Sequence, residues 1–219
     1  MKKIKFKAPQ DTRFTKAGRI YTGIAFNDGD KLRVHTIRGT VTISKSDVVE
    51  NVKKETKPTA PTSAAYKLFA DTCFETAIRW RDGWKSVISG KQFKPGEYDK
   101  LHAGHFLSRL NWGTRHRGIN CHAITQGENY AMSRGDVRTI NKYANFLEKT
   151  YGDNVLSELD EMAMQPVKLS ISFLQEDCRY CWEYLNLYVD ANKELANRIA
   201  SWPTKKKNAI NKVKEYLGY

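Results

Sequence analysis

Residues 54–63 constrain the fold more than any other stretch, because they divide the chain into two parts of different character. The segment KETKPTAPTS contains two prolines, three threonines and no large apolar side chain, a composition typical of a linker. It predicts two domains, residues 1–53 and residues 64–219, in a chain of 219 residues that is long enough for two modest cores. Ser63 is placed to cap a helix that follows.

Residues 1–53 have the pattern of short strands. Runs rich in Val, Ile, Thr and Tyr alternate with glycine-containing turn signals, and L-R-V-H-T-I and T-V-T-I-S repeat with a period of two. Several short strands in a segment of this length predict a small SH3-like or OB-like β-barrel. Its basic residues either bind DNA or a protein partner or keep the barrel in solution, and the sequence leaves these alternatives open: Lys2, Lys3, Lys5, Lys7, Arg33 and Arg38.

The remaining chain is mostly helical by its periodicity, so the predicted fold class is α+β. Apolar residues recur at three- and four-residue spacing after Ser63, and helices are expected at Val137–Tyr151 and from Asp153 to about Met164. Between Ile171 and Ile199 the apolar residues form a single stripe that includes Cys178 and Cys181. The stripe favours packing of both cysteines over redox or zinc chemistry.

The charge of the chain favours a nucleic-acid partner, and its cysteine content argues against a disulfide-stabilised protein. The net charge is +13, and the excess of Lys and Arg lies in the N-terminal region, in residues 101–145 and in the C-terminal tail. Nucleic acid is the commonest partner for such a charge distribution, although general solubility is the alternative. Four cysteines do not make a disulfide framework, and neither a signal peptide nor a membrane-spanning stretch is recognisable. We therefore expect a cytoplasmic protein without membrane partners.

The segment from Leu101 to Asp136 carries the residues with catalytic potential. It holds four of the five histidines, and His105, Asn120 and Asn129 follow one another as a predicted strand end, the next strand and the helix after it. A hydrolytic hairpin needs a base, a group that orients the base and a metal ligand in that order. Histidine suits the first role because its ordinary pKa lies near neutrality.

These residues also carry a resemblance to a known family. The run A-G-H-F-x-S-R, then T-R, N-C-H-A, E-N and R-G resembles the phage NinG (Rap) recombination endonucleases, which belong to the HNH or ββα-metal nucleases. The likeness extends from about Phe69 to about Asp160 and includes R-x-R-D-G at Arg79–Gly83 and S-G-K at Ser89–Lys91. It implies a ββα-metal (HNH-like) nuclease core with C-terminal helices in residues 64–219.

The resemblance also implies the role of each residue. His105 is the expected general base, Asn120 orients it, and Asn129 is the helix-borne metal ligand. His102 stands where the family has an aspartate, and a nitrogen ligand there favours ions softer than Mg²⁺. One divalent ion is expected, Mg²⁺ or Mn²⁺ first and Zn²⁺ or Ni²⁺ as alternatives. The predicted DNA contacts are Arg109, Arg115, Arg117 and Arg134.

The implied activity is that of a divalent-metal-dependent endodeoxyribonuclease, a phosphodiester hydrolase. Its substrates would be Holliday junctions and D-loops in phage recombination, in the host cell cytoplasm, and a homodimer is the simplest arrangement for cutting two strands. The family's paired zinc cysteines are replaced, so no structural zinc is expected. Two alternatives remain open: a catalytically inactive HNH-derived DNA-binding protein, and a phage protein that binds and modulates a host enzyme.

Overall fold

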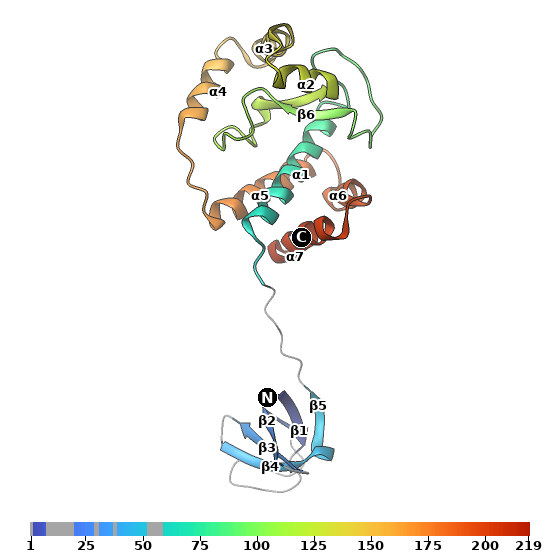
Figure 1. The fold of residues 1–219 in the computed structure, drawn as a ribbon, viewed down its shortest axis with the longest axis vertical. Coiled ribbons are helices and arrows are strands. Elements are labelled where there is room, and N and C mark those ends of the chain that lie inside the picture. Colours follow the sequence, from blue (N-terminus) through green and yellow to red (C-terminus); the bar gives the residue numbers. More distant parts are fainter. Residues whose placement is uncertain (1, 8–19, 29–30, 37–38, 52–58) are drawn as a thin grey trace. The chain divides into compact units, whose positions relative to one another are not determined.

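The computed structural model describes residues 2–7, 20–28, 31–36, 39–51 and 59–219, which form a mixed α+β fold (Figure 1). The chain divides into two compact units, Met1–Thr59 and Ala60–Tyr219, and this boundary lies inside the predicted linker. Among the helices in these ranges, none is both long and apolar enough to cross a bilayer.

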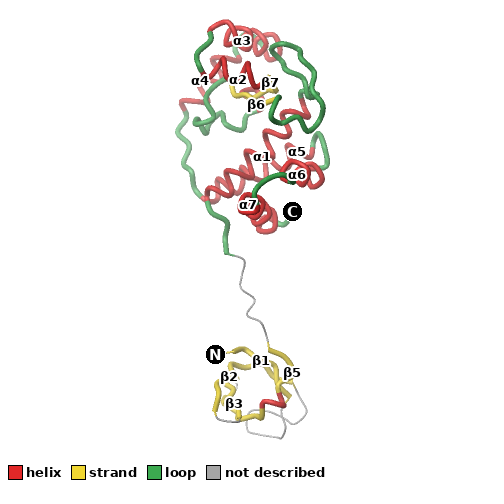
Figure 2. The backbone as a smooth tube through the Cα atoms, turned by 45° about the vertical axis from the view of Figure 1, so that its right-hand side comes forward, coloured by secondary structure: helices red, strands yellow, loops and turns green. Residues whose placement is uncertain are grey.

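The N-terminal unit is an antiparallel sheet with the strand order β4-β3-β2-β1-β5 (Figure 2). A turn of 3-10 helix, η1, separates β4 from β5. Within the described residues β4 and β5 are both edges, so the sheet is open where the sequence predicted a barrel. Its buried side chains are Phe6, Ala25, Val34, Val41 and Ile43. The elements are β1 Lys2–Lys7, β2 Ile20–Asp28, β3 Lys31–Thr36, β4 Gly39–Ser44, η1 Lys45–Asp47 and β5 Val48–Asn51.

The predicted basic surface of this unit falls largely outside the described part of the chain. Arg33 is exposed on β3. The other members of that surface are Arg38 and the side chains of Lys2, Lys3, Lys5 and Lys7, all of which lie outside the description.

Helix α1, Ser63–Arg81, is the centre of the C-terminal unit. Thr62 caps it instead of Ser63, because Thr62 has extended backbone angles and its hydroxyl accepts the Ala65 N–H at 3.2 Å. Its apolar residues are buried against three helices that lie beside it in Figure 1. These are α5 Ile171–Asn186, α6 Ala191–Ile199 and α7 Thr204–Leu217.

The single stripe predicted between Ile171 and Ile199 belongs to two helices. Helix α5 ends at Asn186, and Asp190 caps α6 by accepting the Lys193 N–H at 3.1 Å. The prediction missed this break because apolar residues continue across it. Burial of Cys178 and Cys181 is confirmed, and both thiols lie in the core.

A hairpin followed by a helix lies at the other end of α1. Strands β6 and β7 pair from Leu101 with Thr125 to His105 with Cys121. Thr125 and Glu128 then form a capping box that starts α2 directly after the strand. The elements of this part are β6 Leu101–His105, η2 Gly118–Asn120, β7 Cys121–Thr125, α2 Gln126–Ser133, α3 Val137–Tyr151 and α4 Val155–Met164.

The R-x-R-D-G stretch ties α1 to this hairpin. The Arg79 guanidinium donates to the Leu101 carbonyl at 2.7 Å on β6, and Arg81 donates to the Cys121 carbonyl at 2.9 Å on β7. Asp82 accepts the Ala123 N–H at 2.7 Å. Both arginines therefore bond the backbone of the hairpin, and Arg81 also pairs with the Asp82 carboxylate at 2.7 Å.

Candidate active site

His105 ends β6 and is held by a backbone carbonyl. Its Nε2 lies 2.9 Å from the carbonyl oxygen of Arg115. A carbonyl only accepts, so Nε2 carries the proton and Nδ1 keeps its lone pair. Burial lowers the pKa of His105 to about 4, while the hydrogen bond to the Arg115 carbonyl opposes the shift. The imidazole is consequently neutral near pH 7 and has one nitrogen available as a base.

Asn120 does not orient His105 directly, which corrects the role expected for it. Its side chain is fully buried and bonds the backbone of the loop formed by residues 106–117. The amide oxygen accepts the Leu107 N–H at 2.7 Å, and the amide nitrogen donates to the carbonyls of Leu107 and Thr114, both at 3.1 Å. Because Thr114 precedes Arg115, Asn120 positions His105 through the loop.

The same loop is fixed to α4 at its far side. The Asn111 side chain donates to the Ala163 carbonyl at 2.8 Å. A Cβ atom on Gly113 would lie 2.2 Å from the Met162 carbonyl oxygen, so this position requires glycine. The loop 106–117 is therefore packed against α4, although it is long for a connection between two strands.

His102 and Asn129 are brought together as predicted for the two metal ligands, with 3.1 Å between His102 Nδ1 and Asn129 Nδ2. Burial and the charge of Arg79 lower the pKa of His102. Gly104 belongs to β6, and a Cβ atom there would meet the Ile124 side chain of β7 at 2.1 Å and Asn129 Oδ1 of α2 at 3.3 Å. The glycine of A-G-H therefore leaves room for Ile124 and lets Asn129 approach the strand.

A cavity of about 730 Å³ lies beside His105 and Asn129, and His102 is not among the residues that line it. His105 and Asn129 both line it, together with Arg109 and Glu75. Glu75 comes from α1, and its carboxylate lies 3.9 Å from the Arg109 guanidinium. The sequence analysis missed Glu75 because it stands outside the hairpin; a carboxylate one residue after Phe74 in a strongly apolar helix was the available signal.

The four arginines predicted to contact DNA differ in availability. The predicted DNA contact of Arg115 is wrong, because its guanidinium is buried. It donates two hydrogen bonds to the Asp71 carboxylate, at 2.8 and 2.6 Å, and another to the Arg109 carbonyl. Arg109 has 62% of its side chain exposed, and Arg117 is exposed beside a second cavity. Arg134 is exposed at the end of α2 and bonds the Tyr130 hydroxyl at 2.9 Å.

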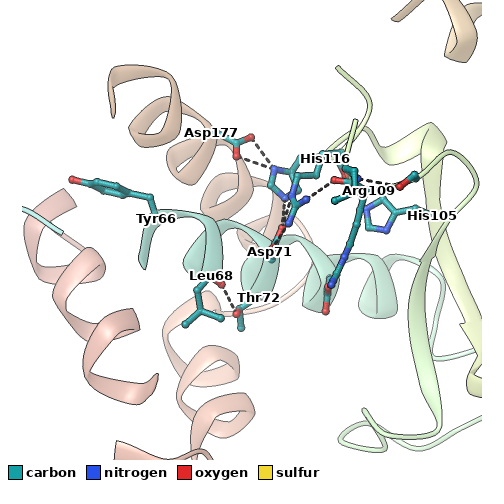
Figure 3. A network of polar contacts seen from close by, with 12 residues as sticks. Tyr66, Leu68, Asp71, Thr72, His105, Arg109, His116 and Asp177 are labelled. Atoms are coloured by element: carbon teal, nitrogen blue, oxygen red, sulfur yellow. Dashed lines mark hydrogen bonds and ion pairs between the residues drawn. The ribbon is translucent and has the colours of Figure 1, made fainter. Parts of the chain in front are cut away.

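His116 forms the centre of a buried polar cluster that sequence reasoning did not anticipate (Figure 3). Its Nε2 lies 2.9 Å from Asp71 on α1, and its Nδ1 lies 2.8 Å from Asp177 on α5. Burial alone would lower the pKa of His116, but the hydrogen bonds that its ring donates to the two carboxylates outweigh burial and the pKa is raised. Despite burial, His116 and Arg115 lower the pKa of Asp71 to about 2. We call Asp71, Arg115, His116 and Asp177 the His116 cluster.

Side chains able to hold a metal meet at a different place from the predicted site. In the described part of the chain, a close set of three His, Cys, Asp or Glu ligands occurs at His116, Asp177 and Cys181, whose ligand atoms lie within 4.8 Å of one another. His122 packs instead between tyrosines, with its nitrogens 3.1 Å from the Tyr143 hydroxyl and 2.9 Å from the Tyr151 hydroxyl.

Comparison with known proteins gives no match: neither a protein-family model, nor a curated protein, nor a solved structure is similar to this chain.

Proposed function

We propose that this protein is a divalent-metal-dependent DNA endonuclease of the HNH type, with its active site in the cavity around His105. The observation that carries the proposal is the pairing, in one cavity, of a neutral histidine with a helix-borne ligand. His105 is fixed at Nε2 by the Arg115 carbonyl, and Asn129 approaches from α2 beside His102. This is the order of base and ligand that a strand-strand-helix nuclease requires.

Each residue has a specific part in the hydrolysis. His105 Nδ1 takes a proton from the attacking water, and the Arg115 carbonyl holds the imidazole in the reactive tautomer. His102 and Asn129 would hold one divalent ion, and Glu75 adds a carboxylate to the cavity that Asn129 lines. Such an ion supplies charge that stabilises the phosphate as it accepts the nucleophile. Glu75 offsets the loss of the family's aspartate, which makes Mn²⁺ or Mg²⁺ a suitable ion again.

DNA contacts are proposed for the arginines that remain available. Arg109 lies on the wall of the cavity, while Arg117 and Arg134 are exposed on the loop and on α2. Tyr130 is 60% exposed, and Arg134 lies over its ring with 5.6 Å to the centroid. A guanidinium and an aromatic ring side by side suit backbone and base contacts. The resemblance to the NinG group points to branched DNA, and two cuts in one junction favour a homodimer.

For the N-terminal unit we propose an SH3-like fold in preference to an OB-like one. Strands β1 to β4 follow one another as a meander, and β5 returns to pair with β1 after the turn η1. An OB-fold has a Greek-key order instead. We assign this unit to DNA or partner binding.

One observation favours an inactive DNA-binding protein as the alternative. The Asn129 amide bonds His102 Nδ1, which occupies a nitrogen that a metal would need. Binding an ion then requires this hydrogen bond to break. A protein that modulates a host enzyme is the third reading.

A nicking assay separates these functions. The parent and a His102→Ala, Asn129→Ala double variant are incubated with supercoiled plasmid and with a four-way junction, in Mn²⁺ or Mg²⁺, with and without EDTA. We expect EDTA-sensitive cleavage by the parent and none by the double variant. Binding of both DNAs without cleavage would establish the inactive module, and absence of both binding and cleavage would leave the host-enzyme reading.

A further inference from the structure

We propose that His116, Asp177 and Cys181 bind one zinc-type divalent ion, which anchors the loop 106–117 to α5. This site uses none of the residues assigned to cleavage, and the inference does not depend on the proposed function. Figure 3 shows His116 reaching from the loop toward Asp177 on α5 and Asp71 on α1.

The three donors match the chemistry of zinc in type and in reach. Imidazole nitrogen, carboxylate oxygen and thiolate sulfur are all common zinc ligands, at about 2.0–2.3 Å from the ion. Two ligands of one ion can therefore be at most about 4.6 Å apart. The ligand atoms here lie within 4.8 Å of one another, and Nδ1 is already 2.8 Å from the Asp177 carboxylate. Small side-chain adjustments suffice to close the set.

Helix geometry and burial bring two of the three ligands together in the absence of an ion. Asp177 and Cys181 are four residues apart on α5, which puts both side chains on one face of the helix. Cys181 is fully buried and only 12% of the Asp177 side chain is exposed. A cavity of about 310 Å³ is lined by His116, Asp177 and Tyr180, and it gives room for a water molecule as fourth ligand.

Asp71 supplies the outer support that zinc-binding histidines usually have. Histidines that bind metal through one nitrogen commonly donate the other N–H to a carboxylate. Here Nε2 faces Asp71 Oδ1 at 2.9 Å, and the Arg115 fork fixes that carboxylate in turn. This arrangement leaves Nδ1 as the nitrogen that faces Asp177 and the ion.

The net charge of the site stays the same when a divalent ion replaces two protons. Without an ion, both ring nitrogens of His116 lie at hydrogen-bond distance from carboxylate oxygens, so both carry a proton, and the Cys181 thiol carries another. Binding of a divalent ion displaces one proton from the imidazolium and one from the thiol. Two positive charges leave and two enter, so no uncompensated charge is buried.

Cobalt titration of the full-length, chelator-treated protein tests the site. A thiolate bound to Co²⁺ gives a charge-transfer absorption band in the near ultraviolet, and we expect this band to saturate at one ion per chain and to disappear when zinc is added. Cys181→Ser should abolish the band and weaken binding at least about tenfold, and Asp71→Asn should weaken binding about 10–100-fold. Cys178→Ser, one turn earlier on α5 and also buried, is the matched control and should keep the band.

The outcome is decisive in each case. Absence of the band in the parent, or its equal loss in Cys178→Ser and Cys181→Ser, overturns the proposal. If Cys181→Ser fails to fold by circular dichroism, Asp177→Asn decides, because it keeps the size of the side chain and should still lower cobalt affinity. His105→Ala should keep the band, so failure of the nuclease proposal and failure of this one are distinguishable.

Discussion

His105 and His116 stand at the two ends of one loop, yet their environments differ in every respect that sets a histidine's chemistry. Both rings pack against Phe74, with centroids 6.5 and 5.1 Å away. His105 has a backbone carbonyl as its polar partner, and burial lowers its pKa to about 4. His116 lies between two carboxylates that raise its pKa. The polar partner of a buried histidine, more than the depth of its burial, therefore decides whether its pKa is lowered or raised.

The largest expected effect comes from His105→Ala. Loss of the base should lower the rate of DNA cleavage by about 10²–10⁴ while DNA affinity changes little, because no exposed cation is removed. Single-turnover cleavage and filter binding measure the two quantities. His122→Gln, at another buried histidine, is the control and should retain most of the activity. Equal rates for His105→Ala and the parent would remove His105 from the mechanism.

Breaking the His116 cluster should affect stability instead. Asp71→Ala leaves Arg115 without its carboxylate partner and removes one of the two carboxylates that bond His116, and we expect a loss of about 2–4 kcal/mol in the free energy of unfolding. The figure lies slightly below that of a fully buried pair because 24% of the Asp71 side chain is exposed. Urea unfolding followed by circular dichroism measures it. Asp136→Ala removes an exposed helix cap and should cost only about 1 kcal/mol; a similar loss in both variants would mean that the cluster contributes little.

Asn120→Ala should have a smaller effect on both the rate of cleavage and the free energy of unfolding, because Asn120 bonds the loop that joins His105 to His116. Two loop carbonyls and the Leu107 N–H lose their partner, at a cost of about 1–3 kcal/mol. Cleavage should also fall, because the loop no longer holds the Arg115 carbonyl against His105. The shape of the pH–rate profile should stay that of the parent, since the base is unchanged. A shifted profile would indicate that Asn120 contacts the reacting groups.

The smallest effect concerns pH. The neutral imidazole of His105 is the active form, and its pKa is lowered to about 4, so kcat/KM should fall less than about twofold between pH 7 and pH 5. A histidine with the ordinary pKa of about 6.5 would lose about 25-fold over the same range. His116 should make the stability of the protein depend on pH in the opposite direction. Because its pKa is raised, the stability that His116 contributes is fully present below about pH 6.5 and is lost as the pH rises through its pKa in the folded protein. A steep acid loss of activity would contradict the assignment of His105.

The sequence was sufficient for features that depend on local pattern. The helix Val137–Tyr151 was predicted to the residue, because Gly152 with its positive φ ends it. The resemblance implied that His102 and Asn129 share an ion, and their side chains do lie close together although 27 positions separate them. The helix was predicted from residues next to one another in the chain, where spacing determines geometry.

The sequence was insufficient where a side chain's partner comes from a distant element. Arg115 looked like its neighbours in a basic loop, and only the fold brings Asp71 to it across 44 positions. Asp177 and Glu75 were missed for the same reason. Asn120 was assigned to the imidazole by the resemblance, and nothing in the sequence indicates that its amide bonds the loop backbone instead.

Gly113 has a consequence for the substrate. The loop 106–117 contacts the Met162 carbonyl at Gly113, bonds the Asn120 side chain at Thr114, and bonds Asp71 through His116. These contacts leave the loop little freedom to change its conformation around a ligand. In the proposed complex, DNA at His105 must then supply the distortion itself. Bending an intact duplex of 20–30 base pairs by 40–90° costs of order 1–6 kcal/mol, whereas a junction or a displaced strand is already bent or open. A preference for branched DNA would then follow from the stiffness of the loop, without any side chain that recognises the branch.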